Sequence, residues 1–268
     1  VLEKGNYDGN ETFKSGKIGF KNTKDTVSDW NSKGWGVINY DMGFTLSSNV
    51  GIVELTNKKI TGGELKDYLL KLGFSKKTGI SLPNELSGKV NFRYPIEIAN
   101  AGFGQGITTT PIQMLQAITP IANDGNMLKP YIVKKIVDSN NKTIYEGKRE
   151  VVGKVASTKT VDKMKELMYN VINDAPDRAT GTRYKIEGYD IIGKTGTAQY
   201  INPKTGKYVT GEGNYIRSFI GMFPKDDPEI IIYIAMKDPI TLGAGLPETT
   251  KKLIKDISNY RGMYKDLR

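Results

Sequence analysis

The residues with the clearest chemical potential lie in a short stretch at residues 191–200, which reads IIGKTGTAQY. The apolar start of this stretch predicts a buried strand, and its polar end brings a cation, hydroxyls and a glycine to one edge. Lys194 beside Thr195 suits an anionic group such as a carboxylate. Gly196 has no side chain, so the backbone of a ligand can lie against the strand there. The stretch therefore predicts a binding edge for a ligand that carries an anionic group.

The tripeptide Lys-Thr-Gly is weak evidence by itself, because it occurs at residues 77–79, 194–196 and 204–206. The first copy follows the end of a helix-like segment, and the last lies in a turn composition. Only the copy at Lys194 lies in a predicted strand. The predicted strand around this copy, and not the tripeptide sequence itself, makes it a candidate site.

A second polar group, Ser47, Ser48 and Asn49, lies between two apolar segments, as where one helix ends and another begins. These side chains could take part in chemistry, but serine and asparagine also cap helices, and from the residues alone capping is the more frequent use. A further Ser-x-Asn at residues 139–141 lies in a predicted hairpin turn, and we interpret it as part of that turn. Trp30 either anchors a loop on the core or lines a cleft.

The composition excludes several reaction types. The chain has 268 residues and contains neither cysteine nor histidine, which excludes Ser-His-Asp triads, Cys-His pairs and thiolate metal sites. Any acid or base must then be a lysine, a tyrosine or a carboxylate. The formal charge of +10 favours an anionic partner, but the lysines are spread along the chain. We therefore expect no nucleic-acid binding. The carboxylates Asp226, Asp227 and Glu229 surround Pro228 and are interpreted as a surface turn, so we expect no metal, and we expect no cofactor.

The periodicity predicts an α+β fold in which an antiparallel sheet is flanked by helices and preceded by a mostly helical region. Residues 1–188 form that helical region, with loops and a hairpin, and residues 189–268 form the sheet strands and a closing helix. The last strand, 230–236, is apolar at successive positions, which predicts cover on both faces. The glycines at 102–106 are interpreted as a loop with closely packed backbone and not as a phosphate loop. The other expected elements are helices at 63–73, 158–173 and 248–260, the last with Leu253 and Ile257 facing inward, a helix opened by Thr110-Pro111, and a hairpin at 129–152 that turns at 138–142.

Several motifs follow one another in a fixed order: Ser47-Ser48-Asn49, Gly102-Phe103-Gly104-Gln105-Gly106, Thr110-Pro111-Ile112-Gln113, Lys194-Thr195-Gly196-Thr197-Ala198-Gln199 and Ser218-Phe219-Ile220-Gly221. With these motifs the chain resembles the transpeptidase domain of class B penicillin-binding proteins over nearly its whole length. The resemblance implies the penicillin-binding, serine β-lactamase-like α+β fold. The surroundings of Trp30 and residues 123–130 are most similar to the division-associated enzymes of Gram-positive bacteria.

The resemblance implies an enzyme that cross-links peptidoglycan stem peptides through a serine acyl-enzyme and is inhibited by β-lactams. In that family a Ser-x-x-Lys serine attacks the penultimate carbonyl of a D-Ala-D-Ala peptide, and an amine of a neighbouring stem peptide takes the acyl group. Carried over by motif, Ser47 helps pass the proton to the leaving nitrogen, Asn49 holds the substrate amide, and Lys194 supplies positive potential. The substrate-binding residues that the resemblance implies are Ser48, Thr195, Gly196, Thr197, Gln199 and Trp30.

The chain departs from the family pattern in its nucleophile. Ser-x-x-Lys precedes Ser-x-Asn in the family, whereas the one such tetrapeptide here, Ser139-Asn140-Asn141-Lys142, follows it in a predicted turn. Serine and lysine three apart share a face only in a helix, so we reject Ser139. We expect the sequence to be the C-terminal part of a transpeptidase domain, without the nucleophile helix, two sheet strands and the upstream membrane anchor. Such a chain alone is expected to be inactive and to expose the apolar edge of 230–236.

Two other functions remain open. A serine β-lactamase shares the motifs but must activate a deacylating water, and the glycine loop and tryptophan pattern argue against it. A non-catalytic penicillin-recognising module would sense antibiotic or act as a scaffold in a wall-synthesis complex. The resemblance also implies a parent protein at the outer face of the bacterial cytoplasmic membrane. Its partners would be stem peptides, β-lactams, a wall-synthesis glycosyltransferase and the missing N-terminal part of the same polypeptide.

Overall fold

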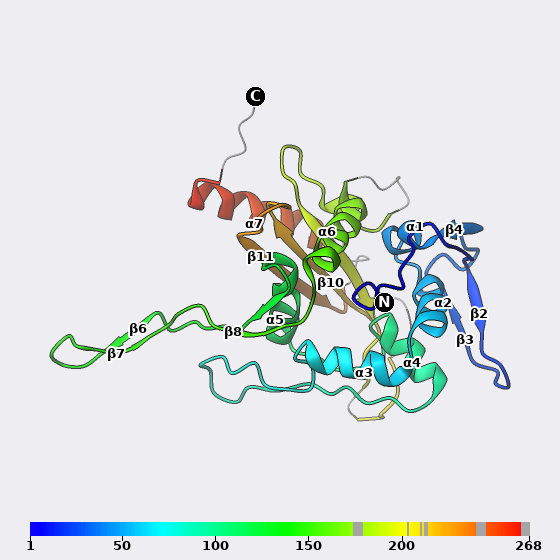
Figure 1. The fold of residues 1–268 in the computed structure, drawn as a ribbon, viewed down its shortest axis with the longest axis horizontal. Helices are drawn as coiled ribbons and strands as arrows, with labels where there is room; N and C mark the ends of the chain where they lie inside the picture. The colour runs from blue at the N-terminus through cyan, green and yellow to red at the C-terminus, as the bar shows by residue number, and fades with distance from the viewer. Residues whose placement is uncertain (174–178, 203, 210, 212–213, 240–244, 264–268) are drawn as a thin grey trace.

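The computed structural model describes residues 1–173, 179–202, 204–209, 211, 214–239 and 245–263 (Figure 1). The strands are β1 (Thr12–Lys14), β2 (Lys17–Gly19), β3 (Thr26–Ser28), β4 (Val37–Asn39), β5 (Asn126–Leu128), β6 (Lys135–Val137), β7 (Thr143–Glu146), β8 (Val151–Lys154), β9 (Ile192–Ala198), β10 (Ile216–Phe223) and β11 (Ile230–Lys237). The helices are α1 (Tyr40–Thr45), α2 (Asn49–Lys59), α3 (Gly62–Lys71), α4 (Pro95–Gly102), α5 (Pro111–Ala122), α6 (Thr158–Ile172), the 3-10 helix η1 (Thr182–Tyr184) and α7 (Gly245–Arg261).

A three-stranded antiparallel sheet in the order β11-β10-β9 is the central element. The register places Lys194 opposite Ile220 and Gly196 opposite Ser218. These strands confirm the antiparallel set predicted between residues 189 and 236. Within the described residues, neither β9 nor β11 has a second partner strand.

Helices cover both faces of this sheet. On one face, Met168 of α6 packs with Ile192 and Met222, together with residues of α5. On the other face, Phe219 packs with Ile254 and other residues of α7. The even-numbered residues of β11 join the α7 cluster, and its Ile231 joins the cluster of α5 and α6. The prediction that the last strand is covered on both faces is therefore confirmed.

The predicted helices α3, α5 and α6 form, and local signals explain where they begin. At α5, the Thr110 hydroxyl accepts a hydrogen bond from the Gln113 N–H, and the Gln113 side chain accepts one from the Thr110 N–H. This reciprocal pair is a capping box. None of the helices in the described ranges combines the length and hydrophobicity needed to cross a membrane.

The inward face of α7 differs from the prediction at one position. Leu253 is 41% exposed, whereas its neighbour Ile254 is fully buried. The buried stripe includes the polar residues Thr250 and Ser258, which lie four residues to either side of Ile254. A search for apolar periodicity misses this stripe because two of its members are polar. Ile257 does pack against the core, as predicted.

The interpretation of the glycine loop as closely packed backbone is wrong. At Gly104 an added Cβ atom would meet nothing within 4 Å, and at Gly106 its nearest neighbour would lie 3.9 Å away. Both glycines instead have positive φ angles, 91° and 74°. Glycine adopts this conformation without the steric cost of a side chain. The loop therefore needs glycine for its turn and not for close packing.

The hairpin of β6 and β7 extends away from the rest of the chain (Figure 1). Every residue of its two strands is exposed. In its turn, the Asp138 carboxylate accepts hydrogen bonds from the N–H groups of Asn140 and Lys142. This confirms the predicted turn and places Ser139 outside any helix.

Candidate active site

Strand β9 holds Lys194 in a fixed position. Ile192 is fully buried in the core, two residues before the lysine. At Gly193 an added Cβ atom would lie 2.7 Å from the carbonyl oxygen of Ile220 and 2.7 Å from the ring of Phe219. Only glycine fits so close an approach of two strands. The strand is therefore packed tightly against β10 directly before Lys194.

The side chains of Lys194 and Ser47 meet, although 147 positions separate them in the sequence. Lys194 Nζ donates a 2.6 Å hydrogen bond to Ser47 Oγ and a 3.1 Å hydrogen bond to the carbonyl oxygen of Thr195. The ammonium also lies 5.9 Å from the centre of the Phe44 ring. Ser47 has a φ of 58°, a conformation that is uncommon outside glycine and often found at functional sites. The structure thus brings the Ser-x-Asn and Lys-Thr-Gly motifs together.

Burial lowers the pKa of Lys194 from 10.5 to about 8. Between these values the unfolded chain binds more protons than the folded protein, so this group should increase the stability as the pH rises from about 8 to 10.5. We expect the Lys194 signal in ¹³C-lysine NMR to titrate with a midpoint near pH 8, with the signal assigned by its absence in Lys194→Met. A midpoint near the ordinary lysine value of ~10.4 would contradict this expectation.

Ser48, next to Ser47, has a structural task. Its hydroxyl accepts a 2.9 Å hydrogen bond from the Gly51 N–H and so caps α2. The same hydroxyl donates a 2.9 Å hydrogen bond to Asp29. The capping interpretation is therefore confirmed for Ser48, whereas Ser47 makes the contact with Lys194.

Asp29 is a buried carboxylate, 4% exposed, that joins three segments of the chain. One of its oxygens accepts hydrogen bonds from the Ser48 hydroxyl and, at 3.0 Å, from the Val50 N–H. The other oxygen accepts a 2.8 Å hydrogen bond from the Gly16 N–H. Asp29 thereby fixes the start of α2, and with it the adjoining Ser47.

We expect Asp29→Asn to lower the free energy of unfolding by about 1–3 kcal/mol, because the amide would direct N–H donors at an N–H donor of the protein. Urea denaturation would measure the loss. Asp256→Asn is the matched control, because Asp256 lies in an exposed pair with Lys252 on α7. Surface pairs of this kind contribute about 0–1 kcal/mol. Equal losses in the two variants would contradict the role of Asp29.

Asn49 is the first residue of α2, and its side-chain amide donates a 3.0 Å hydrogen bond to the carbonyl oxygen of Ser28. This contact connects the start of α2 with the end of β3. In the described part of the chain, no direct hydrogen bond joins the side chains of Asn49 and Lys194. Asn49 therefore belongs to the Ser47 side of the site.

The two threonines of β9 have partners that the sequence analysis missed. The hydroxyls of Thr195 and Thr180 lie 2.5 Å apart and share a hydrogen bond. The guanidinium of Arg217 lies 3.4 Å from the Thr197 hydroxyl, to which it donates. Arg217 is the residue that pairs with Thr197 in the sheet register. The strand edge thus carries a second cation besides Lys194.

The remaining predicted site residues lie around this edge. At Gly196 an added Cβ atom would lie 2.6 Å from the Ser218 hydroxyl. Gln199 follows the last residue of β9. The Trp30 indole N–H donates a 2.9 Å hydrogen bond to the carbonyl oxygen of Leu46, directly before Ser47. Its side chain is 57% exposed, so Trp30 holds its loop to the segment before Ser47 through this hydrogen bond and not through full burial.

The sequence analysis gave no role to Asp29, Thr180 or Arg217. Of these three residues, only Arg217 could have been found in the sequence. Arg217 directly precedes the Ser-Phe-Ile-Gly motif, so aligning the two antiparallel strands would place it opposite Thr197. Asp29 and Thr180 lie in segments without periodicity. Their partners are set by the tertiary fold.

The family model of the penicillin binding protein transpeptidase domain matches residues 1–258. Stage V sporulation protein D of Bacillus subtilis is 36% identical over 214 residues, which cover 78% of this chain and 32% of that protein. Penicillin-binding protein PbpB of Mycolicibacterium smegmatis is 34% identical over 213 residues, which cover 76% of this chain and 32% of that protein. The chain spans about a third of the length of these two curated relatives.

Solved structures agree with these matches. Penicillin binding protein 2X from Streptococcus thermophilus superimposes with a TM-score of 0.87 at 29% identity, over 96% of this chain and 39% of that chain. Penicillin binding protein 3 of Mycobacterium tuberculosis, solved in complex with aztreonam, gives a TM-score of 0.86 at 28% identity, over 98% of this chain and 60% of that chain. The predicted fold and resemblance are confirmed: the chain belongs to the transpeptidase-domain family of class B penicillin-binding proteins.

Proposed function

We propose that the chain forms the Ser-x-Asn and Lys-Thr-Gly part of a peptidoglycan D,D-transpeptidase domain, which cross-links stem peptides and is inhibited by β-lactams. The observation that carries this proposal is the 2.6 Å hydrogen bond from Lys194 to Ser47, which joins the two motifs into one polar site. Among the relatives, a protein of Neisseria meningitidis named as a probable peptidoglycan D,D-transpeptidase is 29% identical over 74% of this chain. Penicillin binding protein 3 of Mycobacterium tuberculosis has been solved with aztreonam and with ampicillin.

The proposed reaction uses a Ser-x-x-Lys serine in a helix, which these 268 residues do not supply, because their one such tetrapeptide lies in a turn. The serine oxygen bonds to the carbonyl carbon of the penultimate D-Ala, and the bond to the nitrogen of the terminal D-Ala breaks. The serine proton passes to the lysine of that motif and reaches the leaving nitrogen through Ser47, whose hydroxyl Lys194 orients. The nitrogen of a stem-peptide amine then bonds to the same carbonyl carbon, the bond from that carbon to the serine oxygen breaks, and the proton released by the amine returns to the serine oxygen.

The remaining roles follow from the chemistry of the strand edge. The cations of Lys194 and Arg217 supply positive potential for the terminal carboxylate of the substrate or of a β-lactam, and the Thr195 and Thr197 hydroxyls donate hydrogen bonds to it. The backbone N–H of Thr197 serves as one donor of the oxyanion hole. Asn49 holds the substrate amide. Ser48 acts through the α2 cap, and the substrate backbone lies along Gly196, between Gln199 and Trp30.

Intact-mass spectrometry with benzylpenicillin tests this function. The 268-residue chain should keep its mass of 29.7 kDa, because it lacks a helical Ser-x-x-Lys serine. A polypeptide that carries this chain together with such a serine should gain one penicillin and release it slowly. Rapid release would favour a β-lactamase, and no adduct on the longer polypeptide would favour a recognition module. An adduct on the 268-residue chain would overturn the assignment of the nucleophile.

A transpeptidase of this kind acts where peptidoglycan is assembled. We therefore place the parent protein at the outer face of the bacterial cytoplasmic membrane, with a glycosyltransferase of the wall-synthesis complex as its protein partner. The net charge of +10 suits an environment of anionic wall polymers.

A further inference from the structure

The contact between Ser47 and Lys194 depends on how α1 lies against the sheet. Ser47 follows α1 by two residues, and Lys194 is on β9. Helix α6 packs against both of these elements. Phe44, in the last turn of α1, contacts the cluster formed by Met168 of α6 and Ile192 of β9. Helix α6 is therefore the common support of the two halves of the site.

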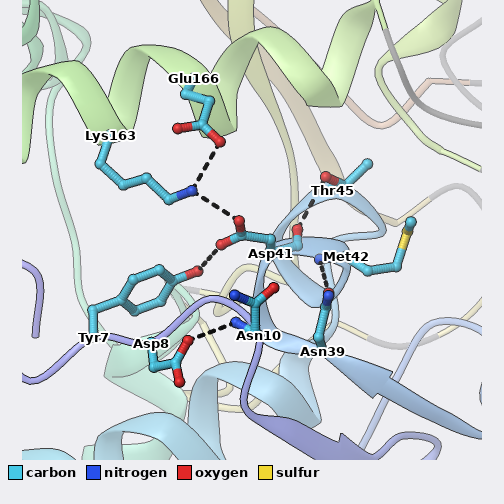
Figure 2. A network of polar contacts seen from close by, with 9 residues as sticks. All are labelled: Tyr7, Asp8, Asn10, Asn39, Asp41, Met42, Thr45, Lys163 and Glu166. Carbon is cyan, nitrogen blue, oxygen red and sulfur yellow. Dashed lines mark hydrogen bonds and ion pairs between the residues drawn. The ribbon is translucent and has the colours of Figure 1, made fainter.

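A polar network fastens the other end of α1 to α6 (Figure 2). Lys163 of α6 donates a 2.8 Å hydrogen bond to one oxygen of Asp41 and another of 2.8 Å to Glu166. The Tyr7 hydroxyl donates a 2.6 Å hydrogen bond to the second oxygen of Asp41. Figure 2 shows the Asp41 carboxylate between Tyr7 and Lys163, which come from different segments of the chain. We call Asp41, Lys163 and Tyr7 the α1 clasp.

The clasp is partly shielded from water, with side-chain exposures of 26% for Lys163 and 27% for Asp41. Burial opposes the charge of Lys163, but its hydrogen bonds to Asp41 and Glu166 outweigh burial and raise its pKa. Burial and the hydrogen bond to Asp41 raise the pKa of Tyr7, which keeps its proton for donation. A partly buried ion pair with an additional hydrogen-bond donor holds its geometry better than an exposed pair.

The clasp and the apolar contact act at opposite ends of α1, which has six residues and is therefore about 9 Å long. The other side of α1 is packed as well, because Tyr40 lies in a cluster with Phe13 and Val50. Asp41, three residues before Phe44, adds a tie through Lys163 to α6, the helix that also supports β9. Because Ser47 follows directly beyond the last turn, a shift of α1 relative to α6 would change its distance from Lys194.

We propose that Lys163 and Asp41 are positioning residues for Ser47. The ion pair between Lys163 and Asp41 sets the approach of the Ser47 hydroxyl to Lys194. The catalytic part of this inference rests on the proposed transpeptidase function. Its geometric part does not, and can be tested without any reaction.

The geometric test is the titration of Lys194, followed by ¹³C-lysine NMR in the protein and in the variants Lys163→Met and Asp41→Asn. If the clasp positions α1, either variant loosens the site and exposes Lys194 to water. Its midpoint should then rise in both variants, by about 0.5–1 pH unit. If the clasp acts only through its charges, the two variants should shift the midpoint in opposite directions, because one removes a positive charge and the other a negative charge. Opposite shifts, or no shift, would overturn the proposal.

Two further variants complete the test. Tyr7→Phe removes one contact of the clasp without changing its charge, and it should also raise the titration midpoint of Lys194. This variant replaces a charge variant that fails to fold. An unmoved midpoint in Tyr7→Phe would then overturn the proposal. Lys252→Met is the control, because it breaks an ion pair of 2.7 Å on the distant α7 and should leave Lys194 unchanged.

Acylation by benzylpenicillin separates the two proposals. In a polypeptide that also carries the Ser-x-x-Lys serine, Lys163→Met should slow acylation by about 10–100-fold while the protein stays folded. Absence of acylation in the unmodified polypeptide would contradict the proposed function but leave the NMR result standing. Normal acylation in Lys163→Met, together with an unmoved Lys194 midpoint, would contradict the positioning role alone.

Discussion

Replacing Lys194 by methionine is expected to slow acylation by benzylpenicillin by about 10²–10³-fold, measured in a polypeptide that carries this chain together with a Ser-x-x-Lys serine. The variant loses the ammonium that donates to the Ser47 hydroxyl at 2.6 Å, and with it the positive potential that we propose for the ligand carboxylate. Methionine keeps the length and apolar character of the lysine stem. The loss should therefore report the charge and the hydrogen bond, and not a cavity.

The chain provides a matched control for this variant. Lys204 begins the same tripeptide in a turn, and Lys204→Met should acylate at the normal rate. Lys194→Met should also be at least as stable as the unmodified protein, because burial disfavours the charged form of Lys194 and lowers its pKa. A slow but destabilised Lys194→Met, or an equal loss in Lys204→Met, would contradict the assigned role.

Alanine at Ser47 and at Ser48 should have different effects, although the two serines are adjacent. Ser47→Ala is expected to slow acylation by about 10²–10⁴-fold, because it removes the hydroxyl that we propose passes the proton to the leaving nitrogen. Ser48→Ala is expected to lower the free energy of unfolding by about 0.5–2 kcal/mol, because it removes the cap of α2. Acylation kinetics and urea denaturation of both variants would separate the two roles.

The comparison has a built-in check. Ser48→Ala also leaves one oxygen of the buried Asp29 with a single partner, the Val50 N–H. Its stability loss should therefore exceed that of Ser47→Ala. If Ser48→Ala were stable but slow, and Ser47→Ala fast but unstable, the roles of the two serines would have to be exchanged.

The sequence predicted those parts of the site that depend on local rules. The apolar residues before Lys194 placed it in a strand, and the polar break between two apolar segments placed Ser47 and Ser48 at a helix junction. Capping preferences favoured a structural use of the serines, and motif resemblance favoured a chemical one. Both were needed, because Ser48 caps α2 and Ser47 contacts Lys194.

The parts that could not be predicted depend on the tertiary fold. Asp29 receives hydrogen bonds from residues 13, 19 and 21 positions away in the sequence, and no periodicity marks it. The ion pair of Asp41 and Lys163 joins residues 122 positions apart. On α7, polar Thr250 and Ser258 lie in the buried stripe, so the apolar pattern indicated Leu253, whereas Ile254 is the buried residue.

The hairpin of β6 and β7 also determines where the protein can be altered without harm. Trypsin would meet exposed lysines on β6 and in the turn, such as Lys135 and Lys142, at a distance from α6 and β9. Cleavage, insertion or labelling is tolerated best at exposed loop tips of this kind. A fluorophore or affinity handle placed at the hairpin turn should therefore leave the chemistry of Ser47 and Lys194 untouched. The hairpin of β6 and β7 is therefore a place at which the protein can be immobilised or labelled while reactions at Ser47 and Lys194 are followed.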